Sequence, residues 1–170
     1  GSSCTACAVG TFKDTMGNAT GDGLCETCRS HSTSLTASDS VDDCLCEMGF
    51  TLDAGVCVTC EVDFYKSFVG PAACLPCPAN SVTLYPGATA LTDCVCDLGY
   101  YGASCDPCEA GTYKDVSGNG NCVPCPTHST SLAGSTSVSE CLCNPGYYLL
   151  NGQCEQCAVA KYKTYHGNSG

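Results

Sequence analysis

Short extended segments rather than helices are what the pattern of apolar and polar positions predicts for this chain. Aromatic residues stand beside glycine in runs such as Gly10 to Phe12 and Gly146 to Tyr148, and Gly, Asn and Asp bound these runs. Such runs are typical of two-stranded β-hairpins. No stretch keeps the spacing of an amphipathic helix, and the Ser/Thr-rich stretches between the runs are predicted to be irregular loops.

The cysteine content indicates what can hold such short hairpins together. The chain has 20 cysteines in 170 residues, no Trp and a net charge of -11. A cysteine content above roughly 8–10% marks a disulfide scaffold, and a hairpin alone is only marginally stable in water. Disulfides, each contributing roughly 3 kcal/mol when they close a loop of about 15 residues, are therefore predicted to replace a large apolar core.

Compartment and partners follow from the same composition. Disulfides at this density persist only in an oxidising environment, so we expect an extracellular location, secreted or on the cell surface. The acidic balance argues against nucleic acid as a partner. The segment also has no apolar run long enough for direct membrane insertion.

The cysteines recur with a period of roughly fifty residues. The predicted repeats cover residues 7–57, 60–105 and 108–154, with the tail of a preceding repeat at 1–6 and the start of a truncated fourth repeat at 157–170. Cys4 and Cys157 are left over by this division. Each is expected to pair with a cysteine outside residues 1–170, in a neighbouring repeat or an adjoining chain, because disulfide geometry does not allow distant ends to be joined.

The order of the motifs resembles the EGF-like module and, in its fuller form, the cysteine-rich repeat of ephrin receptors. The motifs are Cys-x-x-Gly-Thr-Tyr-Lys, Cys-x-x-Cys-Pro and Cys-x-Cys-x-x-Gly-Tyr-Tyr, and variants of them recur between residues 7 and 163. Similar repeats occur in long surface proteins and flagellar-hair (mastigoneme) proteins of protists and algae. The resemblance implies a small disulfide-rich fold, with tandem EGF-like modules of short β-hairpins in an elongated rod.

The EGF-like resemblance also implies how the cysteines pair. The first pairs with the third, the second with the fourth and the fifth with the sixth, a choice that rests on the resemblance because six cysteines allow many connectivities. The implied bridges are Cys7–Cys28, Cys25–Cys44, Cys46–Cys57, Cys60–Cys77, Cys74–Cys94, Cys96–Cys105, Cys108–Cys125, Cys122–Cys141 and Cys143–Cys154.

Metal binding is the alternative use of the same cysteines. Cys4-x-x-Cys7 and Cys25-x-x-Cys28 have the spacing of a four-cysteine structural zinc site. Zinc would leave each Cys-x-Cys without a role, so no metal is predicted. Calcium is not expected either, because a calcium-binding EGF module needs an acidic or amide cluster before its first cysteine, and these repeats have none.

Catalysis is not predicted. His31 and His128 occupy the same repeat position, where the second repeat has Asn80. A residue that repeats by position and is replaceable by Asn is expected to hold a turn. Thiolate chemistry needs a free cysteine, whereas every cysteine inside a repeat has a partner. The aromatic residue after each repeated glycine is expected to pack within its module.

Glycans are the only non-protein groups that we expect. Asn18 lies in an Asn-x-Thr sequon, in a loop that is longer in the first repeat. Two Ser/Thr runs are candidate O-glycan carriers, and the residues concerned are Ser32, Thr33, Ser34, Ser129, Thr130 and Ser131.

A lysine recurs in every repeat, at Lys13, Lys66, Lys114 and Lys163. Two interpretations remain open. The side chain could be a solvated stem that covers the hairpin, or it could contact a neighbouring unit or chain.

The expected function is structural. We expect a segment of a surface filament or cell-coat fibre, in which neighbouring repeats or identical chains are the partners. The alternative is a ligand-binding or adhesive stalk of a cell-surface receptor.

Overall fold

The computed structural model describes residues 5–14, 24–159 and 161–169. Asn18 and Cys4 lie outside these ranges. The chain divides into two compact units, Gly1–Cys77 with Thr83–Cys94 and Pro78–Val82 with Val95–Gly170. The repeat boundaries expected from the cysteine pattern remain a prediction.

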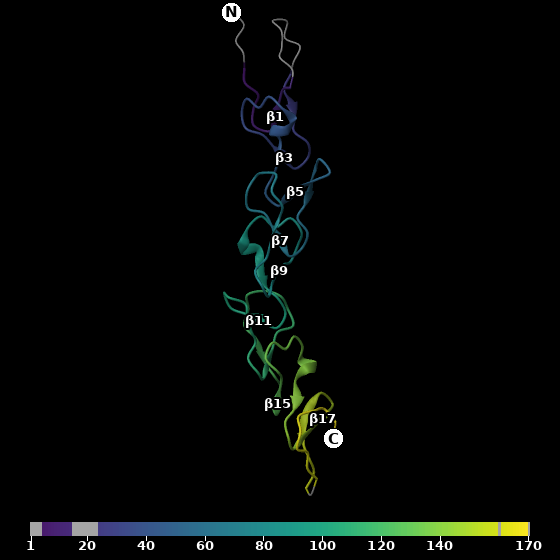
Figure 1. Ribbon diagram of the computed structural model, residues 1–170. Helices are drawn as coiled ribbons and strands as arrows, with labels where there is room; N and C mark the ends of the chain where they lie inside the picture. Colours follow the sequence, from purple (N-terminus) through teal and green to yellow (C-terminus); the bar gives the residue numbers. More distant parts are fainter. Residues whose placement is uncertain (1–4, 15–23, 160, 170) are drawn as a thin grey trace, which may run out of the picture. The chain divides into compact units, whose positions relative to one another are not determined.

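Each sheet in the described residues consists of two short strands that follow each other along the chain, with the odd-numbered strand pairing with the next (Figure 1). Single-turn 3-10 helices precede β4, β10 and β16. The elements are β1 (Thr11–Phe12), β2 (Glu26–Thr27), β3 (Ser32–Thr33), η1 (Val41–Asp43), β4 (Leu45–Cys46), β5 (Phe50–Asp53), β6 (Val56–Thr59), β7 (Phe64–Tyr65), β8 (Leu75–Pro76), β9 (Ser81–Thr83), η2 (Leu91–Asp93), β10 (Cys94–Cys96), β11 (Tyr100–Tyr101), β12 (Asp106–Pro107), β13 (Thr112–Tyr113), β14 (Val123–Pro124), β15 (Ser129–Thr130), η3 (Val138–Glu140), β16 (Leu142–Cys143), β17 (Tyr147–Leu150) and β18 (Gln153–Gln156).

The longest hairpins follow the Gly-aromatic motif, as the sequence predicts. β5 pairs with β6 and β17 with β18, each over four residues and each antiparallel. Their two-residue turns are Ala54-Gly55 and Asn151-Gly152, and all four residues have positive φ. A turn of this length with positive φ at both positions matches the right-handed twist of the strands.

The predicted turn at the repeated His/Asn position is also confirmed. His31, Asn80 and His128 have φ of 60°, 62° and 62°, in the left-handed region where Asn and His are enriched. The His31 ring stacks on Phe50 with 4.0 Å between ring centroids, and His128 stacks on Tyr147 at 4.1 Å. The aromatic residue of the motif therefore packs within its module.

The disulfide pairing differs from the EGF-like pairing that the resemblance implied. The first cysteine of each repeat bonds to the second and the third bonds to the fourth, whereas the expected fifth-to-sixth bridges are present. The predicted bridges Cys7–Cys28, Cys25–Cys44, Cys60–Cys77, Cys74–Cys94, Cys108–Cys125 and Cys122–Cys141 are wrong. The bridges in the structure are Cys7–Cys25, Cys28–Cys44, Cys46–Cys57, Cys60–Cys74, Cys77–Cys94, Cys96–Cys105, Cys108–Cys122, Cys125–Cys141 and Cys143–Cys154.

The reason lies in the Cys-x-x-Cys motif. Its two middle residues form a strand, such as β8 between Cys74 and Cys77, so the two cysteines flank that strand. Residues three apart along a strand point to opposite faces. Cys74 therefore bonds back to the opening Cys60, and Cys77 bonds forward to Cys94.

Cysteines supply most of the buried hydrophobic side chains of the described residues. Cys46, Cys60, Cys96, Cys108 and Cys143 are at most 1% exposed. Phe12 is the one aromatic residue among the buried hydrophobic side chains of the described ranges. The prediction of a small disulfide-rich fold of tandem hairpin modules, stabilised by cross-links rather than by a large core, is therefore confirmed.

Candidate functional site: the lysine junctions between repeats

The repeated lysine marks the contact between consecutive repeats. Lys66, just after β7 in the second repeat, is 0% exposed. Its Nζ donates to the carbonyl oxygens of Phe50 at 2.6 Å and Gly70 at 2.5 Å, with a longer contact to that of Cys46 at 3.5 Å. In the repeat division predicted from the cysteines, Cys46 and Phe50 belong to the first repeat and Lys66 to the second, so this side chain would join two repeats through their backbones.

Backbone hydrogen bonds surround the buried amine. Gly49 N donates to Lys66 O at 3.0 Å, and Gly70 N donates to Cys46 O at 2.9 Å. Cys60 N donates to Gly49 O at 2.8 Å. The loop after Cys46 and the loop around Lys66 are therefore bonded in both directions, and we call this arrangement a lysine junction.

A second lysine junction has the same construction. Lys114 is 2% exposed, and its Nζ donates to Gly118 O at 2.5 Å, with a longer contact to Asp97 O at 3.4 Å. Gly99 N donates to Lys114 O at 3.0 Å, and Gly118 N donates to Cys96 O at 2.7 Å. Gly99, Cys96 and Gly118 occupy the repeat positions of Gly49, Cys46 and Gly70. Asp97 occupies the position of Glu47, which does not bond to Lys66, so the contact with the preceding repeat differs in this junction.

A third lysine junction completes the series. Lys163 is 6% exposed, and its Nζ donates to Tyr147 O at 2.8 Å and to Gly167 O. Gly146 N donates to Lys163 O at 2.8 Å, and Gly167 N donates to Cys143 O at 3.1 Å. The construction is therefore a property of the repeat and not of one loop.

A buried lysine is rare unless its charge is satisfied. Three carbonyl oxygens around Lys66 match the three donors of an ammonium group. Burial lowers the pKa of Lys66 below 10.5. Burial also lowers the pKa of Lys114, against the opposing effect of the Asp97 carboxylate. Among the described residues, no buried side-chain nitrogen or oxygen lacks a hydrogen-bond partner.

The glycine before the aromatic residue allows a second loop, the one that contains Gly87 or Gly134, to approach closely. Gly49 is buried with φ +78°, and a Cβ there would lie 2.5 Å from the carbonyl oxygen of Gly87. Gly99, with φ +76°, meets Gly134 O in the same way. Gly146 also has positive φ, but a Cβ there would meet nothing within 4 Å. The first two glycines are needed for space as well as for conformation.

These contacts decide between the two interpretations of the repeated lysines. Lys66, Lys114 and Lys163 contact the neighbouring repeat, and a solvated stem is wrong for all three. Lys13 is half-buried. The acceptor that sequence reasoning missed is the glycine four residues after each buried lysine, a Lys-x-x-x-Gly signal that was visible in the sequence.

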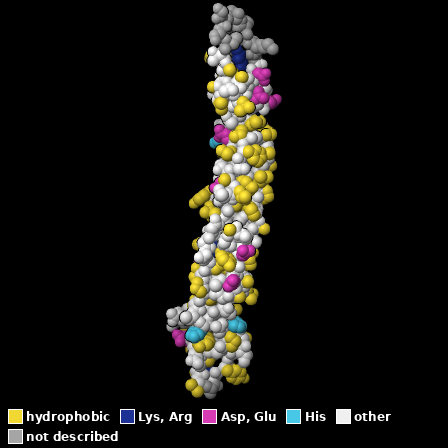
Figure 2. Space-filling model, turned by 90° about the vertical axis from the view of Figure 1, so that its left-hand side faces the viewer, with side chains coloured by type: hydrophobic (Ala, Val, Ile, Leu, Met, Phe, Trp, Pro, Cys, Tyr) yellow, Lys and Arg dark blue, Asp and Glu magenta, His cyan; other side chains and the backbone are white. Residues whose placement is uncertain are grey.

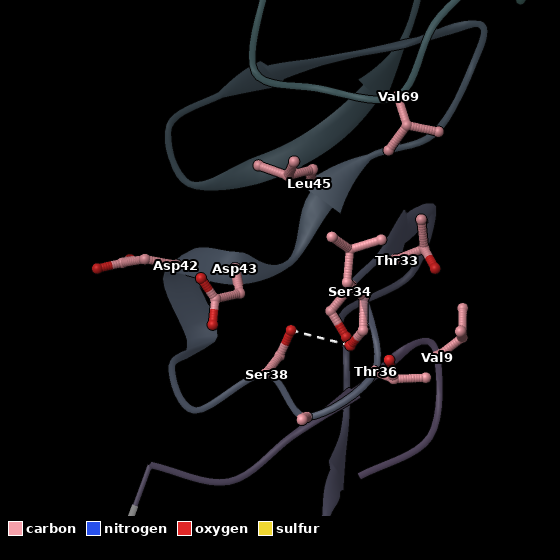
Figure 3. Close-up of a pocket in the computed structure, with 11 residues that line it drawn as sticks. Val9, Thr33, Ser34, Thr36, Ser38, Asp42, Asp43, Leu45 and Val69 are labelled. Atoms are coloured by element: carbon pink, nitrogen blue, oxygen red, sulfur yellow. Dashed lines mark hydrogen bonds between the residues drawn. The ribbon is translucent and has the colours of Figure 1, made fainter. Parts of the chain in front are cut away.

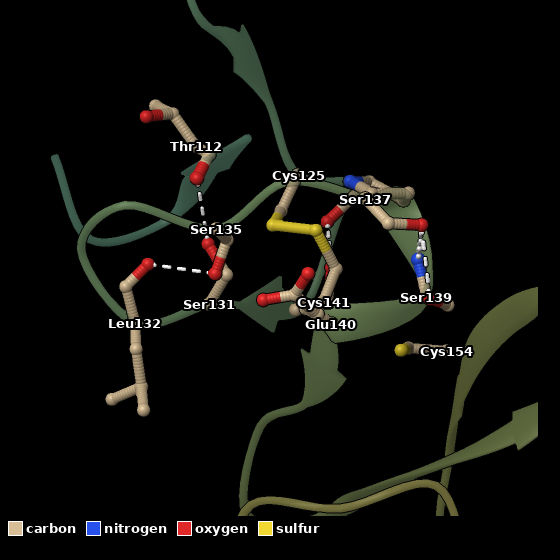
Figure 4. The surroundings of a disulfide bond; sticks show 12 residues. Thr112, Cys125, Ser131, Leu132, Ser135, Ser137, Ser139, Glu140, Cys141 and Cys154 are labelled. Carbon is tan, nitrogen blue, oxygen red and sulfur yellow. Dashed lines mark hydrogen bonds between the residues drawn. A yellow bond between two sulfur atoms is a disulfide. The ribbon is translucent and has the colours of Figure 1, made fainter. Parts of the chain in front are cut away.

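The candidate O-glycan residues are not equally accessible. The Ser/Thr-rich segments that the sequence predicted to be irregular loops contain the strands β3 and β15. Ser34 is buried, and its Oγ donates to Thr11 O at 2.9 Å. Ser131 is buried likewise and donates to Thr112 O at 2.8 Å, beside the Cys125–Cys141 bridge (Figure 4). Burial removes Ser34 and Ser131 from the candidate set.

The other four candidates are half-buried and remain predictions: Ser32, Thr33, Ser129 and Thr130. Within the described ranges, Cys157 is a free, half-buried thiol. Those ranges contain no group of three or more His, Cys, Asp or Glu residues placed to hold a metal. They also contain no helix that is long and apolar enough to cross a membrane.

The fold and the lysine junctions define a tandem array of small cysteine-rich repeats. The family described as tyrosine-protein kinase ephrin type A/B receptor-like matches residues 49–94 and 99–141, more than half of the chain. The chain belongs to this family. Both matches begin at a junction glycine and end at the fourth cysteine of a repeat, so each contains a junction lysine and the glycine four residues after it.

Individual relatives agree with the family match. Ephrin type-A receptor 4-B of Xenopus laevis is 41% identical over 39% of this chain. Cysteine repeat modular protein A of Toxoplasma gondii is 34% identical over 91% of the chain. A rat protein named for its sushi, von Willebrand factor type A, EGF and pentraxin domains is 30% identical over 61%. The chain spans only 6% of the length of the first two relatives and 3% of the third.

The class of protein follows from these matches. The matched regions are non-catalytic cysteine-rich repeats, and the chain resembles such regions of extracellular receptors and of a cysteine repeat modular protein. Disulfides at this density belong to an oxidising environment, outside the cell or at its surface.

Proposed function

We propose that this chain is a structural segment of an extracellular surface filament or cell-coat fibre, whose partners are neighbouring repeats and identical chains. The observation that supports this role most strongly is the threefold occurrence of the lysine junction, with Lys66, Lys114 and Lys163 each buried against the preceding repeat. Domains joined by flexible linkers usually move relative to each other. A junction that buries a charged side chain and joins both backbones by hydrogen bonds restricts such movement, and restricted movement suits a filament.

The similarity to a cysteine repeat modular protein over most of the chain also favours an array. A second candidate role is an adhesive or ligand-binding stalk of a cell-surface receptor, which the 41% identity to ephrin type-A receptor 4-B favours. In that case the repeats would hold a binding domain at a distance from the membrane.

Immunogold electron microscopy of native cells tests the proposal, with an antibody raised against residues 1–170. The filament role predicts label at regular intervals along extended surface structures. Isolated label at the plasma membrane, together with release of the antigen as a monomer by mild detergent, would instead identify a receptor stalk.

A further inference from the structure

An apolar groove with acidic residues on one side lies beside β3 and β4 in the first compact unit (Figure 3). Its volume is about 500 Å³, and Leu35, Leu45 and Val69 are among its lining residues. Asp42 and Asp43 lie together on one side, and Val69 lies on the other in this view. Leu35 is 81% exposed, one of the most exposed leucine side chains of the described residues.

The same groove recurs in the second compact unit. It has a volume of about 590 Å³, and its lining includes Leu132, Leu142, Glu140 and His166. Leu132 and Leu142 occupy the repeat positions of Leu35 and Leu45, and Glu140 that of Asp43. Leu132 is 83% exposed, and Figure 4 shows its side chain extending away from the Cys125–Cys141 bridge. An exposed leucine beside an acid therefore recurs at the same place in two repeats.

The serine hydroxyl groups in these grooves are already engaged. Ser34 and Ser131 donate to backbone carbonyls of β1 and β13, and Ser38 and Ser135 donate to the carbonyls of Leu35 and Leu132. Asp43 Oδ2 and Glu140 Oε1 also accept hydrogen bonds from their own loops. The groups left for recognition are the aliphatic side chains, the Asp42 carboxylate, the second carboxylate oxygens of Asp43 and Glu140, and the threonine hydroxyls of the lining.

The charge of the surface favours a cationic ligand. Three of the six basic residues, Lys66, Lys114 and Lys163, are buried in the lysine junctions, and 17 residues are acidic. On the face shown in Figure 2, Lys and Arg side chains are visible in one place only, near the N-terminal end. Hydrogen bonds from the Thr136 hydroxyl and amide lower the pKa of Glu140, so this groove carboxylate is ionised at neutral pH.

We propose that these grooves bind extended segments of an extracellular partner protein in which a Leu, Ile or Val side chain stands next to Lys or Arg. The aliphatic side chain covers Leu35 or Leu132, and the cation faces Asp42 and Asp43 or Glu140. A second copy of this chain is a poorer occupant, because it carries the same net charge of -11 and has few exposed cations. This binding role goes beyond the structural role of the array, and it is tested separately.

Selection from a random-peptide display library tests the proposal on the disulfide-intact 170-residue chain. Counter-selection against the double variant Leu35→Ser, Leu132→Ser retains the peptides that need the grooves. Both leucines are more than 80% exposed, so the variant keeps the fold. Leu24→Ser serves as the matched control, because Leu24 is 89% exposed and does not line either groove. Fluorescence anisotropy of one selected peptide then gives its affinity for each chain, and analytical ultracentrifugation gives the association state.

The proposal predicts that the selected peptides combine an aliphatic residue with an adjacent Lys or Arg. Their affinity should fall at least about tenfold in the double variant, since burial of a leucine side chain is worth roughly one to two factors of ten. The affinity should not change in Leu24→Ser, and it should fall with added salt. Selected peptides that are neutral or acidic, equal binding to the double variant, or no enrichment at all would overturn the proposal. If the unchanged chain and Leu24→Ser self-associate but the double variant does not, a second copy of the chain is the occupant, and the proposal is also overturned.

Discussion

Replacing Lys66 with Met should open the first lysine junction while the disulfide-linked repeats on either side stay folded. Met keeps an unbranched apolar stem but has no donor for the carbonyl oxygens of Phe50 and Gly70. Both bonds from Lys66 Nζ are short, at 2.6 and 2.5 Å, whereas the contact with Cys46 O at 3.5 Å is at the limit of a hydrogen bond and contributes little.

The expected loss can be estimated from these two bonds. A buried carbonyl oxygen left without its donor costs about 1–3 kcal/mol. Removal of the ammonium also relieves its desolvation cost, which offsets part of the loss. A net loss of about 2–4 kcal/mol corresponds to an opening equilibrium roughly 30-fold to 1,000-fold more favourable.

Native-state hydrogen exchange measured by NMR reports this opening directly. The amides to follow are Gly49 N, which bonds to Lys66 O, and Gly70 N, which bonds to Cys46 O. Both should exchange faster in Lys66→Met by the factor given above, and amides of the β17–β18 hairpin should not change. Lys161→Met is the matched control, because Lys161 is exposed. Unchanged exchange of Gly70 N in Lys66→Met would refute the claim that the buried lysine holds the junction.

Three further predictions concern the turns and the bridges. Gly99→Ala should raise the exchange rate of the second junction's amides more than Gly146→Ala raises that of the third junction's amides. Both substitutions cost about 1–2 kcal/mol because φ is positive, but only at Gly99 would the added Cβ also meet a backbone oxygen. Ala54→Asn should slow amide exchange in the β5–β6 hairpin by a few-fold, about 0.5 kcal/mol, because Asn tolerates the left-handed turn conformation better than Ala. Non-reducing peptide mapping should recover Cys60 linked to Cys74, and a Cys60–Cys77 peptide in its place would restore the EGF-like pairing.

The parts of the fold that depend on local sequence were predictable. Glycine beside an aromatic residue indicated the β5–β6 and β17–β18 hairpins. The presence of Asn80 at the position of His31 and His128 indicated a turn, which the structure shows to have positive φ. Both features depend on backbone conformations that few residue types adopt, so they are visible in a single sequence.

The disulfide pairing could not be derived in this way. Cysteine spacing is compatible with several connectivities, and the choice depends on the strand that separates Cys74 from Cys77. That strand has only two residues, one of them a proline, and carries no alternation of apolar and polar positions. The EGF-like resemblance therefore supplied the wrong partner for the first four cysteines of every repeat.

The lysine junctions were only half predictable. The recurrence of lysine at one position was evident, but a lysine is normally exposed, and the groups that satisfy Lys66 are backbone carbonyls, which every residue has. Only the glycine four residues later, as in Lys114 and Gly118, distinguishes the pattern in the sequence. The structure shows the role of this glycine, because the Gly118 carbonyl oxygen accepts a hydrogen bond from Lys114 Nζ.

The central claim, that consecutive repeats are held together by buried lysines, is tested most directly by amine labelling of Lys161 and Lys163 in the disulfide-intact chain. The two residues lie two positions apart, yet Lys161 is exposed and Lys163 is 6% exposed with its Nζ bonded to Tyr147 O. Brief treatment with an acetylating reagent, followed by mass spectrometry, gives the rate at each site. The account predicts that Lys163 reacts at least about tenfold more slowly than Lys161, because reaction requires the junction to open, and that the difference disappears in the reduced, denatured chain. Equal rates at Lys161 and Lys163 in the native chain would contradict it.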